Sequence, residues 1–190
     1  MMPIGEKPIL GIIIEKLAQS GIKDIIITVG YLEGIIPVYF GDGKKFGVNM
    51  EYFVETEPLG TAGCLSLIEN LDEEFIVMNG DILTSLNFND LIEYHRKMGN
   101  RVTICSYKKE MQLTLGVVDL ASNTVRDYIE KPQYAFDISM GIYAMNRKTV
   151  DHIPKNQYFD FPTLIKRLIS VKEPISVYKF EGEWYDIGRE

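Results

Sequence analysis

The chain has 190 residues, of which 46% are apolar and 25% charged, so it has the composition of a globular domain and is neither disordered nor collagen-like. Its 20 Lys and Arg against 27 Asp and Glu give a net charge of −7, which excludes the basic surface that nucleic acid or an anionic membrane would require. Two cysteines and no leader-like pattern in residues 1–7 predict a cytoplasmic protein without a disulfide scaffold.

Helical and β-branched patterns alternate along the first half of the chain. A helix is expected over 8–20, because Pro8 suits a first helical turn and Ser20-Gly21 is a stop signal. The run 23–29 is apolar on both faces, which is typical of a strand in a sheet covered on both sides. Further strands are expected at 48–54, 75–78 and 101–107, and further helices at 32–40, 64–69 and 88–98. This alternation predicts an α/β fold.

The second half is less regular. Residues 115–129 form two apolar runs around Ala121-Ser122-Asn123, the pattern of a β-hairpin. A strand at 138–145, helices at 147–153 and 161–169 and a strand at 175–180 complete the chain. Without an internal repeat, a low-complexity segment or a linker, residues 1–190 are expected to form a single domain.

Two aspartates are candidates for a metal site. Asp81 follows a buried strand and a glycine, so its carboxylate is expected at the carboxyl end of a sheet strand, where α/β sheets bind ligands. Asp186, in Trp184-Tyr185-Asp186-Ile187-Gly188, is the candidate for a second carboxylate. Carboxylate oxygens suit a divalent cation bound to phosphates, although an aspartate after a strand is often only a turn former.

Two other segments could bind ligands. Residues 57–63, Glu-Pro-Leu-Gly-Thr-Ala-Gly, place small residues between a strand and a helix, where the backbone could approach a base or offer helix-end N–H groups to a phosphate. A plain turn explains this segment equally well. Glu130-Lys131-Pro132 places an acid for sugar hydroxyls beside a base for a phosphate, but such a pair is commonly a solvated strand end.

Read together, six segments of the chain resemble the sugar-1-phosphate nucleotidyltransferases, especially the mannose-1-phosphate guanylyltransferase-like branch and the glucose-1-phosphate cytidylyl- or thymidylyltransferase-like branches. In chain order they are residues 3–10, 57–63, 79–81, 130–132, 140–143 and 184–188. The resemblance covers essentially the whole chain. It implies a Rossmann-like core with a mixed, mostly parallel sheet covered by helices, and a β-hairpin half that binds the sugar.

The same resemblance implies roles for individual residues. Asp81 and Asp186 would hold Mg²⁺ and serve catalysis, and the substrates would be a nucleoside triphosphate and a sugar 1-phosphate. Residues along the base and ribose would be Glu55, Pro58, Gly60 and Thr61. Residues lining the sugar-phosphate pocket would be Gly116, Glu130, Lys131 and Gly141. The products would be a nucleotide sugar and pyrophosphate.

The chain differs from the family at its N-terminal end. Family members begin with a strand and a Gly-rich phosphate loop that would lie ahead of Met1, so we expect an N-terminally truncated form with impaired activity. A central sheet position would then have unpaired backbone groups unless another segment or another chain filled it, which makes a homo-oligomer plausible. Lys7 matches a family lysine next to a proline, but a solvated helix start is its more ordinary interpretation.

Other features favour ordinary structural roles. His95 and His152 are expected at the surface, Cys64 and Cys105 as buried thiols, and residues 41–47 as a loop. The main alternative function is a non-catalytic module that binds a nucleotide sugar or serves as a regulatory subunit. A nicotinamide-dependent oxidoreductase is disfavoured, because no dinucleotide-binding glycine fingerprint lies near the start.

Overall fold

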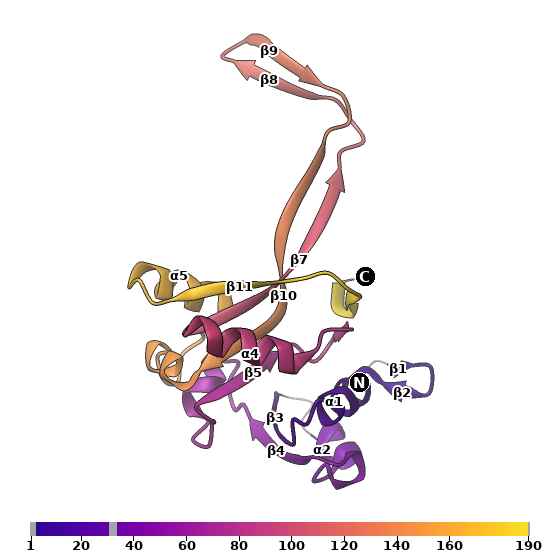
Figure 1. The fold of residues 1–190 in the computed structure, drawn as a ribbon, viewed down its shortest axis with the longest axis vertical. Coiled ribbons are helices and arrows are strands. Elements are labelled where there is room, and N and C mark those ends of the chain that lie inside the picture. Colours follow the sequence, from indigo (N-terminus) through magenta and orange to yellow (C-terminus); the bar gives the residue numbers. More distant parts are fainter. Residues whose placement is uncertain (1–2, 31–33, 190) are drawn as a thin grey trace.

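A four-stranded sheet forms the centre of the computed structural model, which describes residues 3–30 and 34–189 (Figure 1). Its strands lie in the order β11 (Ile175–Phe180), β7 (Val102–Gln112), β10 (Gln133–Asn146) and β5 (Glu74–Met78). β11 pairs in parallel with β7, whereas β10 is antiparallel to both β7 and β5. Three strands therefore share one direction and β10 opposes them, which confirms that the sheet is mixed.

A second, separate pair of strands lies beyond β5. β3 (Asp24–Val29) and β4 (Asn49–Val54) pair in parallel over six residues each. β3 is one edge of this pair and β5 is one edge of the larger sheet, and the described residues contain no ladder between them. Two short antiparallel ribbons, β1 (Pro3–Ile4) with β2 (Lys7–Pro8) and β6 (Ile82–Thr84) with β12 (Trp184–Asp186), complete the body.

The helices begin and end where local chemistry requires it. They are α1 (Ile9–Gln19), α2 (Ile35–Phe40), α3 (Gly60–Gly63), α4 (Phe88–Met98) and α5 (Phe161–Ser170). Asn87 accepts the N–H of Asn89 at 3.0 Å to start α4, and Asp160 accepts the N–H of Thr163 at 2.9 Å to start α5. Gly99, in the left-handed region at φ +61°, ends α4.

Most predicted elements are confirmed, with differences where the chain is short or rich in small residues. The helix expected at 64–69 is α3 followed by a 3-10 turn at Cys64–Leu67, and the one expected at 147–153 is a 3-10 helix at Arg147–His152. α2 begins at Ile35, and part of the helix expected at 32–40 lies outside the described residues. Residues 41–47 form the expected loop around a 3-10 turn at Lys44–Phe46.

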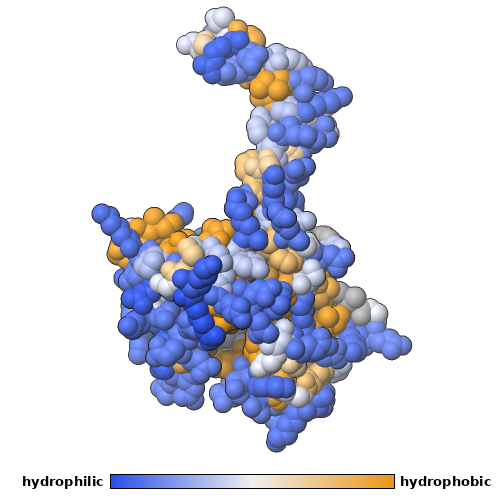
Figure 2. All heavy atoms as spheres, in the orientation of Figure 1, coloured by the Kyte–Doolittle hydropathy of each residue, from blue (hydrophilic) through white to orange (hydrophobic). Residues whose placement is uncertain are grey.

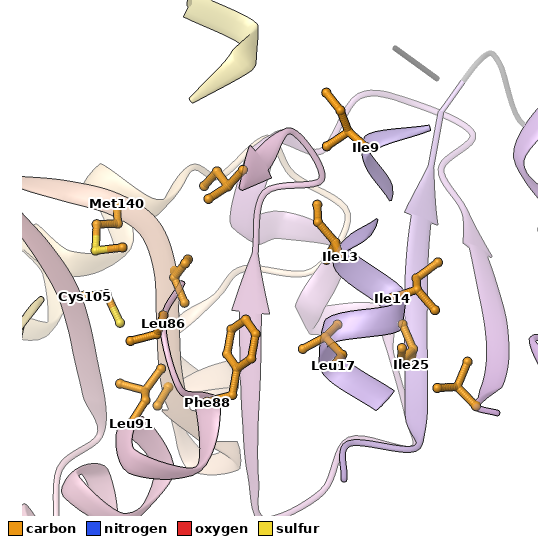
Figure 3. Packing of buried hydrophobic residues seen from close by; sticks show 14 of the residues in the cluster. Ile9, Ile13, Ile14, Leu17, Ile25, Leu86, Phe88, Leu91, Cys105 and Met140 are labelled. Carbon is orange, nitrogen blue, oxygen red and sulfur yellow. The ribbon is translucent and has the colours of Figure 1, made fainter. Parts of the chain in front are cut away.

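Two apolar clusters hold the body together, one on each face of β5. Ile76 and Met78 pack in the first cluster with α1 and α4, whereas Phe75 and Val77 pack in the second with Leu65 and α5. Figure 3 shows Ile14 and Leu17 of α1 beside Ile25 of β3, and Leu86, Phe88 and Leu91 grouped nearer to Cys105 and Met140. The alternation of side chains along a strand explains why a run that is apolar throughout serves both clusters.

A long arm projects from the body (Figure 1). β7 and β10 extend past the predicted limits of 101–107 and 138–145 and pair as far as Gln112 and Gln133. Beyond them, β8 (Val117–Ala121) and β9 (Thr124–Ile129) form the predicted hairpin. Figure 2 shows apolar atoms on the surface of this arm, where Leu120, Val125 and Tyr128 are each more than half exposed.

One predicted location is wrong and one is confirmed. His95 is buried rather than at the surface, because α4 packs it against β7, where its Nδ1 lies 2.8 Å from Thr103 Oγ1. Burial lowers the pKa of His95, because the imidazolium form loses its solvation. Cys64 and Cys105 are buried, free thiols, as predicted.

Within residues 3–30 and 34–189, no helix has both the length and the apolar character needed to span a membrane.

Candidate functional site

The two predicted aspartates, 105 positions apart in the sequence, meet in the structure. Asp81 follows the end of β5 and precedes β6, and Asp186 ends β12. β6 and β12 pair so that Asp186 stands opposite Ile82, next to Asp81 along the chain. The N–H of Ile187 then donates to the carbonyl oxygen of Asp81 at 3.1 Å. The backbone ladder therefore holds the two residues side by side.

Gly188 lies between the two carboxylates. A Cβ at this position would overlap Oδ2 of Asp81 and would stand 3.7 Å from Oδ1 of Asp186. Both carboxylates therefore face the space beside Gly188, and only a residue without a side chain leaves that space open. Sequence analysis placed Gly188 in the last family-like segment but assigned it no role.

The donor set fits a cation that shares its coordination with a phosphate. Mg²⁺ prefers oxygen ligands and is usually bound by one or two carboxylates together with water and substrate phosphates. In the part of the chain that the structure describes, no cluster of three or more Asp, Glu, His or Cys side chains could hold a metal. Two half-buried carboxylates thus suit Mg²⁺ in the presence of a phosphate ligand better than a permanent structural metal.

The segment predicted to lie along a nucleotide has a structural explanation of its own. Gly60 has φ +75°, and a Cβ there would stand 2.8 Å from the carbonyl oxygen of Phe159. The N–H groups of Ala62 and Gly63 donate to that same oxygen at 3.0 and 2.9 Å. These helix-end N–H groups are therefore engaged by the chain itself, contrary to the expectation that they would be offered to a phosphate.

Three residues of the predicted nucleotide set surround this turn. The Glu55 carboxylate accepts the N–H of Leu59 at 3.2 Å, and Thr61 Oγ1 accepts the N–H of Phe161 at 3.1 Å. Pro58 is exposed at the outside of the turn. The contact with residues 157–161 was missed by sequence reasoning, because nothing in the local pattern of either segment indicates a partner about 100 positions away.

A large cavity joins this turn to Asp81. It has a volume of about 1200 Å³, and Thr61, Cys64 and Asp81 all contribute to its lining. Burial raises the pKa of the Cys64 thiol to about 11, with the nearby Glu55 carboxylate adding to the effect. A thiol with such a pKa stays protonated at neutral pH and is a poor nucleophile, so Cys64 is a packing residue of this wall.

Of the predicted sugar-phosphate set, Gly141 lies next to the aspartate site. Its carbonyl accepts the N–H of Asn79 at 3.0 Å, and a Cβ on it would stand 2.8 Å from the Asn79 side-chain nitrogen. Gly141 has φ +71° within an irregular stretch of β10 between Ser139 and Tyr143. On the arm side of this irregularity, β10 no longer pairs with β5 and continues beside β7 into the arm.

The other three sugar-phosphate candidates lie on the arm. Gly116 is beside β8, where a Cβ would overlap the Tyr128 hydroxyl, and that hydroxyl donates to Glu130 at 3.1 Å. Lys131 is exposed, at 3.9 Å from Glu130. Five successive β7–β10 pairs, from Gln112–Gln133 to Lys108–Asp137, lie beyond the part of β7 that pairs with β11, which corresponds to roughly 15 Å of strand. The structure therefore does not bring these three residues to Asp81.

Lys7 also occupies an ordinary environment. It lies in β2 just before α1, and its ammonium group pairs with Glu15 at 2.7 Å. Both side chains are substantially exposed, so the pair contributes little to stability. The expectation of a solvated position at the start of the first helix is confirmed.

Comparison with known proteins gives consistent matches. The sequence profile described as "Nucleotidyl transferase" matches residues 1–190. The chain is 34% identical over 202 residues to the mannose-1-phosphate guanyltransferase of Yarrowia lipolytica, covering 100% of this chain and 54% of that protein. It is 31% identical over 210 residues to a UTP-glucose-1-phosphate uridylyltransferase of Synechocystis sp., covering 100% of this chain and 54% of that one. The chain thus spans about half the length of these curated relatives.

Among solved structures, HddC from Yersinia pseudotuberculosis superimposes with a TM-score of 0.76 at 25% identity. That match covers 99% of this chain and 83% of HddC.

Proposed function

This chain belongs to the nucleotidyl transferase family, and from that premise we propose that it transfers a nucleotidyl group from a nucleoside triphosphate to a sugar 1-phosphate. The two relatives compared above use different bases but are both named for a hexose 1-phosphate. The observation that carries the proposal is the convergence of Asp81 and Asp186 beside Gly188.

The reaction makes modest chemical demands on the protein. A phosphate oxygen of the sugar 1-phosphate attacks the α-phosphorus, a new P–O bond forms, and the bond to pyrophosphate breaks. The attacking oxygen is already anionic, so no side chain has to remove a proton. Bringing two anions together is the main barrier, so positioning and charge neutralisation supply most of the rate.

Each part of the site has a role in this proposal. Asp81 and Asp186 would hold Mg²⁺, which supplies the positive charge that the crowded α-phosphate needs. Glu55, Pro58, Gly60 and Thr61 would lie along the nucleotide, and Thr61 lines the cavity that also includes Asp81. Gly141 would border the sugar phosphate from the body, and Gly116, Glu130 and Lys131 would contact it from the arm.

The position of the arm favours a second candidate, nucleotide-sugar binding without transfer. In the described arrangement Glu130 and Lys131 are separated from Asp81 by the length of the β7–β10 ribbon. A protein that kept this arrangement in solution would bind a nucleotide at the body but would not hold both substrates for reaction. Nucleotide binding without pyrophosphate release would support this candidate.

The deciding experiment measures pyrophosphate release. The chain is incubated with each of the four ribonucleoside triphosphates or dTTP, a panel of sugar 1-phosphates and Mg²⁺, and then with EDTA in excess. We expect release with at least one pair and its loss on chelation. No release with any pair would contradict the proposal.

A further inference from the structure

A second, smaller pocket lies between α1 and the ribbon of β6 and β12. It has a volume of about 380 Å³, which is within the range of sites for small organic ligands. Three of its lining residues, Ile13, Ile82 and Phe88, are buried members of the first core cluster. Tyr185 also lines it and keeps 47% of its surface exposed. None of the residues predicted to bind metal or substrates lines this pocket, so it is a separate site.

Lys16 supplies the positive charge of this pocket. It lies three positions after Ile13 on α1, so both residues project from the same side of the helix. Its ammonium group donates to the carbonyl oxygen of Thr84. The adjacent Glu15 pairs with Lys7 instead, and among the residues that the structure describes no carboxylate forms an ion pair with Lys16. Burial lowers the pKa of Lys16, because its ammonium group loses solvation that no counter-ion replaces.

A half-buried ammonium beside an apolar surface favours an anionic ligand with an apolar body. The group has three donors, of which Thr84 engages one, and a hydrogen bond between two charged groups is stronger than one between neutral groups. The exposed Glu183 also lines the pocket, so a second negative charge on the ligand would be repelled. A carboxylate, with one charge, therefore suits the pocket better than a phosphate monoester, which carries nearly two charges at neutral pH.

The β6–β12 ribbon connects this pocket with the aspartate site. Leu83 and Tyr185 stand opposite each other in the ladder, and both line the pocket. Because side chains alternate along a strand, Tyr185 and the next residue, Asp186, project from opposite faces of the ribbon. Asp186 in turn stands opposite Ile82, next to Asp81 along the chain. A ligand packed against Tyr185 would therefore stabilise the ribbon that holds the two aspartates together.

We propose that this pocket binds a small monocarboxylate with an apolar body, whose carboxylate pairs with Lys16 and whose apolar part packs on Phe88 and Tyr185. The consequence for activity rests on the proposed function: a bound carboxylate would raise the rate of nucleotidyl transfer, because it holds the β6–β12 ribbon and hence the aspartate pair in place.

The binding experiment compares four probes that share a phenyl body but differ in charge: phenylpropionate, phenylpropanol, phenylpropylamine and phenyl phosphate. Methyl NMR spectra of the chain, isotope-labelled at isoleucine and methionine, report the site. We expect phenylpropionate to shift the methyl signals of Ile82 and Met78, which line the pocket, and to leave Ile169 on α5 unshifted. Its Kd should be about 1 mM, as for a small fragment, and the other three probes should bind about tenfold more weakly.

Two lysine variants test the role of the charge. Lys16→Met removes the ammonium group but keeps a long apolar side chain, and Lys97→Met, at an exposed position on α4, is the matched control. Phenylpropionate should bind about tenfold more weakly to the Lys16 variant and equally well to the control. Phenylpropanol should bind equally to all three proteins, because a misfolded variant would lose both probes.

Three results would overturn the binding proposal. The first is that no probe shifts Ile82 or Met78, and the second is that phenylpropionate binds equally to the wild type and the Lys16 variant. The third is that phenyl phosphate binds more tightly than phenylpropionate, which would reject the monocarboxylate.

The effect on activity is measured separately. Pyrophosphate release is followed with phenylpropionate at about ten times its Kd, where roughly 90% of the sites are occupied. We expect an increase of about twofold or more in the wild type and none in the Lys16 variant. Binding with unchanged release would overturn the regulatory role. Binding to a chain that releases no pyrophosphate with any substrate pair would support the pocket but count against the proposed function, so the two proposals fail separately.

Discussion

The body and the arm are built from similar apolar residues but bury them to very different extents. In the body, β5 has a packed cluster on each face, and Leu91 and Leu164 have no solvent exposure. In the arm, all six residues of β9 are exposed, and Leu120 keeps 58% of its surface in water. A two-stranded ribbon has nothing to cover its faces, so the arm is positioned by backbone pairing and the body by packing. Substitutions should therefore affect the two regions differently.

The largest effect is expected at the aspartates of the body. Asp81→Asn and Asp186→Asn should each reduce pyrophosphate release by about 10²–10³-fold, because the charge that binds the cation is lost. Thermal unfolding should change little, since both side chains are only half-buried. Asp151→Asn, at an exposed position, is the matched control. Full activity in either aspartate variant would remove that residue from the metal site.

The next effect separates the two regions by stability. Leu91→Ala should lower the free energy of unfolding by about 2–5 kcal/mol, because it leaves a cavity between α4 and the sheet. Leu120→Ala on the arm should change it by less than about 0.5 kcal/mol. Urea denaturation measures both. Similar losses for the two variants would mean that in solution the arm packs against the body or against a second copy.

A smaller effect is expected from the arm on catalysis. Glu130→Gln should raise the KM for the sugar 1-phosphate by about tenfold, which corresponds to one lost charged hydrogen bond of about 1.4 kcal/mol. The KM for the nucleoside triphosphate should stay unchanged. Glu110→Gln, also exposed on the arm, is the control. An unchanged KM in the Glu130 variant would assign the arm no part in substrate binding.

The smallest expected effect is a pH dependence of the free energy of unfolding, caused by the buried His95 in the body. The pKa of His95 is lowered in the folded state by burial, partly offset by the Glu74 carboxylate and reinforced by Arg96. The unfolded chain, with an ordinary histidine pKa of about 6.5, then binds a proton more readily than the folded chain. Neutral His95 therefore contributes to the free energy of unfolding above about pH 6.5. This contribution is lost as the pH falls through the lower pKa that His95 has in the folded state.

The free energy of unfolding of the wild type, measured by denaturation, should therefore fall as the pH is lowered from 7.5 to 5. In His95→Gln it should fall less over the same pH range. His152→Gln, which changes a half-buried histidine near Glu173, serves as the control. Identical slopes in the His95 variant and the wild type would contradict this assignment.

The sequence by itself determined most of the local structure and singled out two candidate carboxylates. Capping residues such as Asn87 and Asp160, stop signals such as Gly99 and the β-branched run of β3 act within a few positions, so a linear pattern contains them. The candidates Asp81 and Asp186 followed from their positions after apolar segments and from the family resemblance.

Only the tertiary structure decided what lies next to what. The pairing of β6 with β12 brings Asp186 to Asp81, and the loop at 157–161 accounts for the small residues Gly60 and Gly63. The burial of His95 and the distance of Glu130 from the body were equally invisible to local patterns. Each depends on contacts between residues far apart in the chain, and such contacts are set by which faces pack together rather than by neighbouring residues.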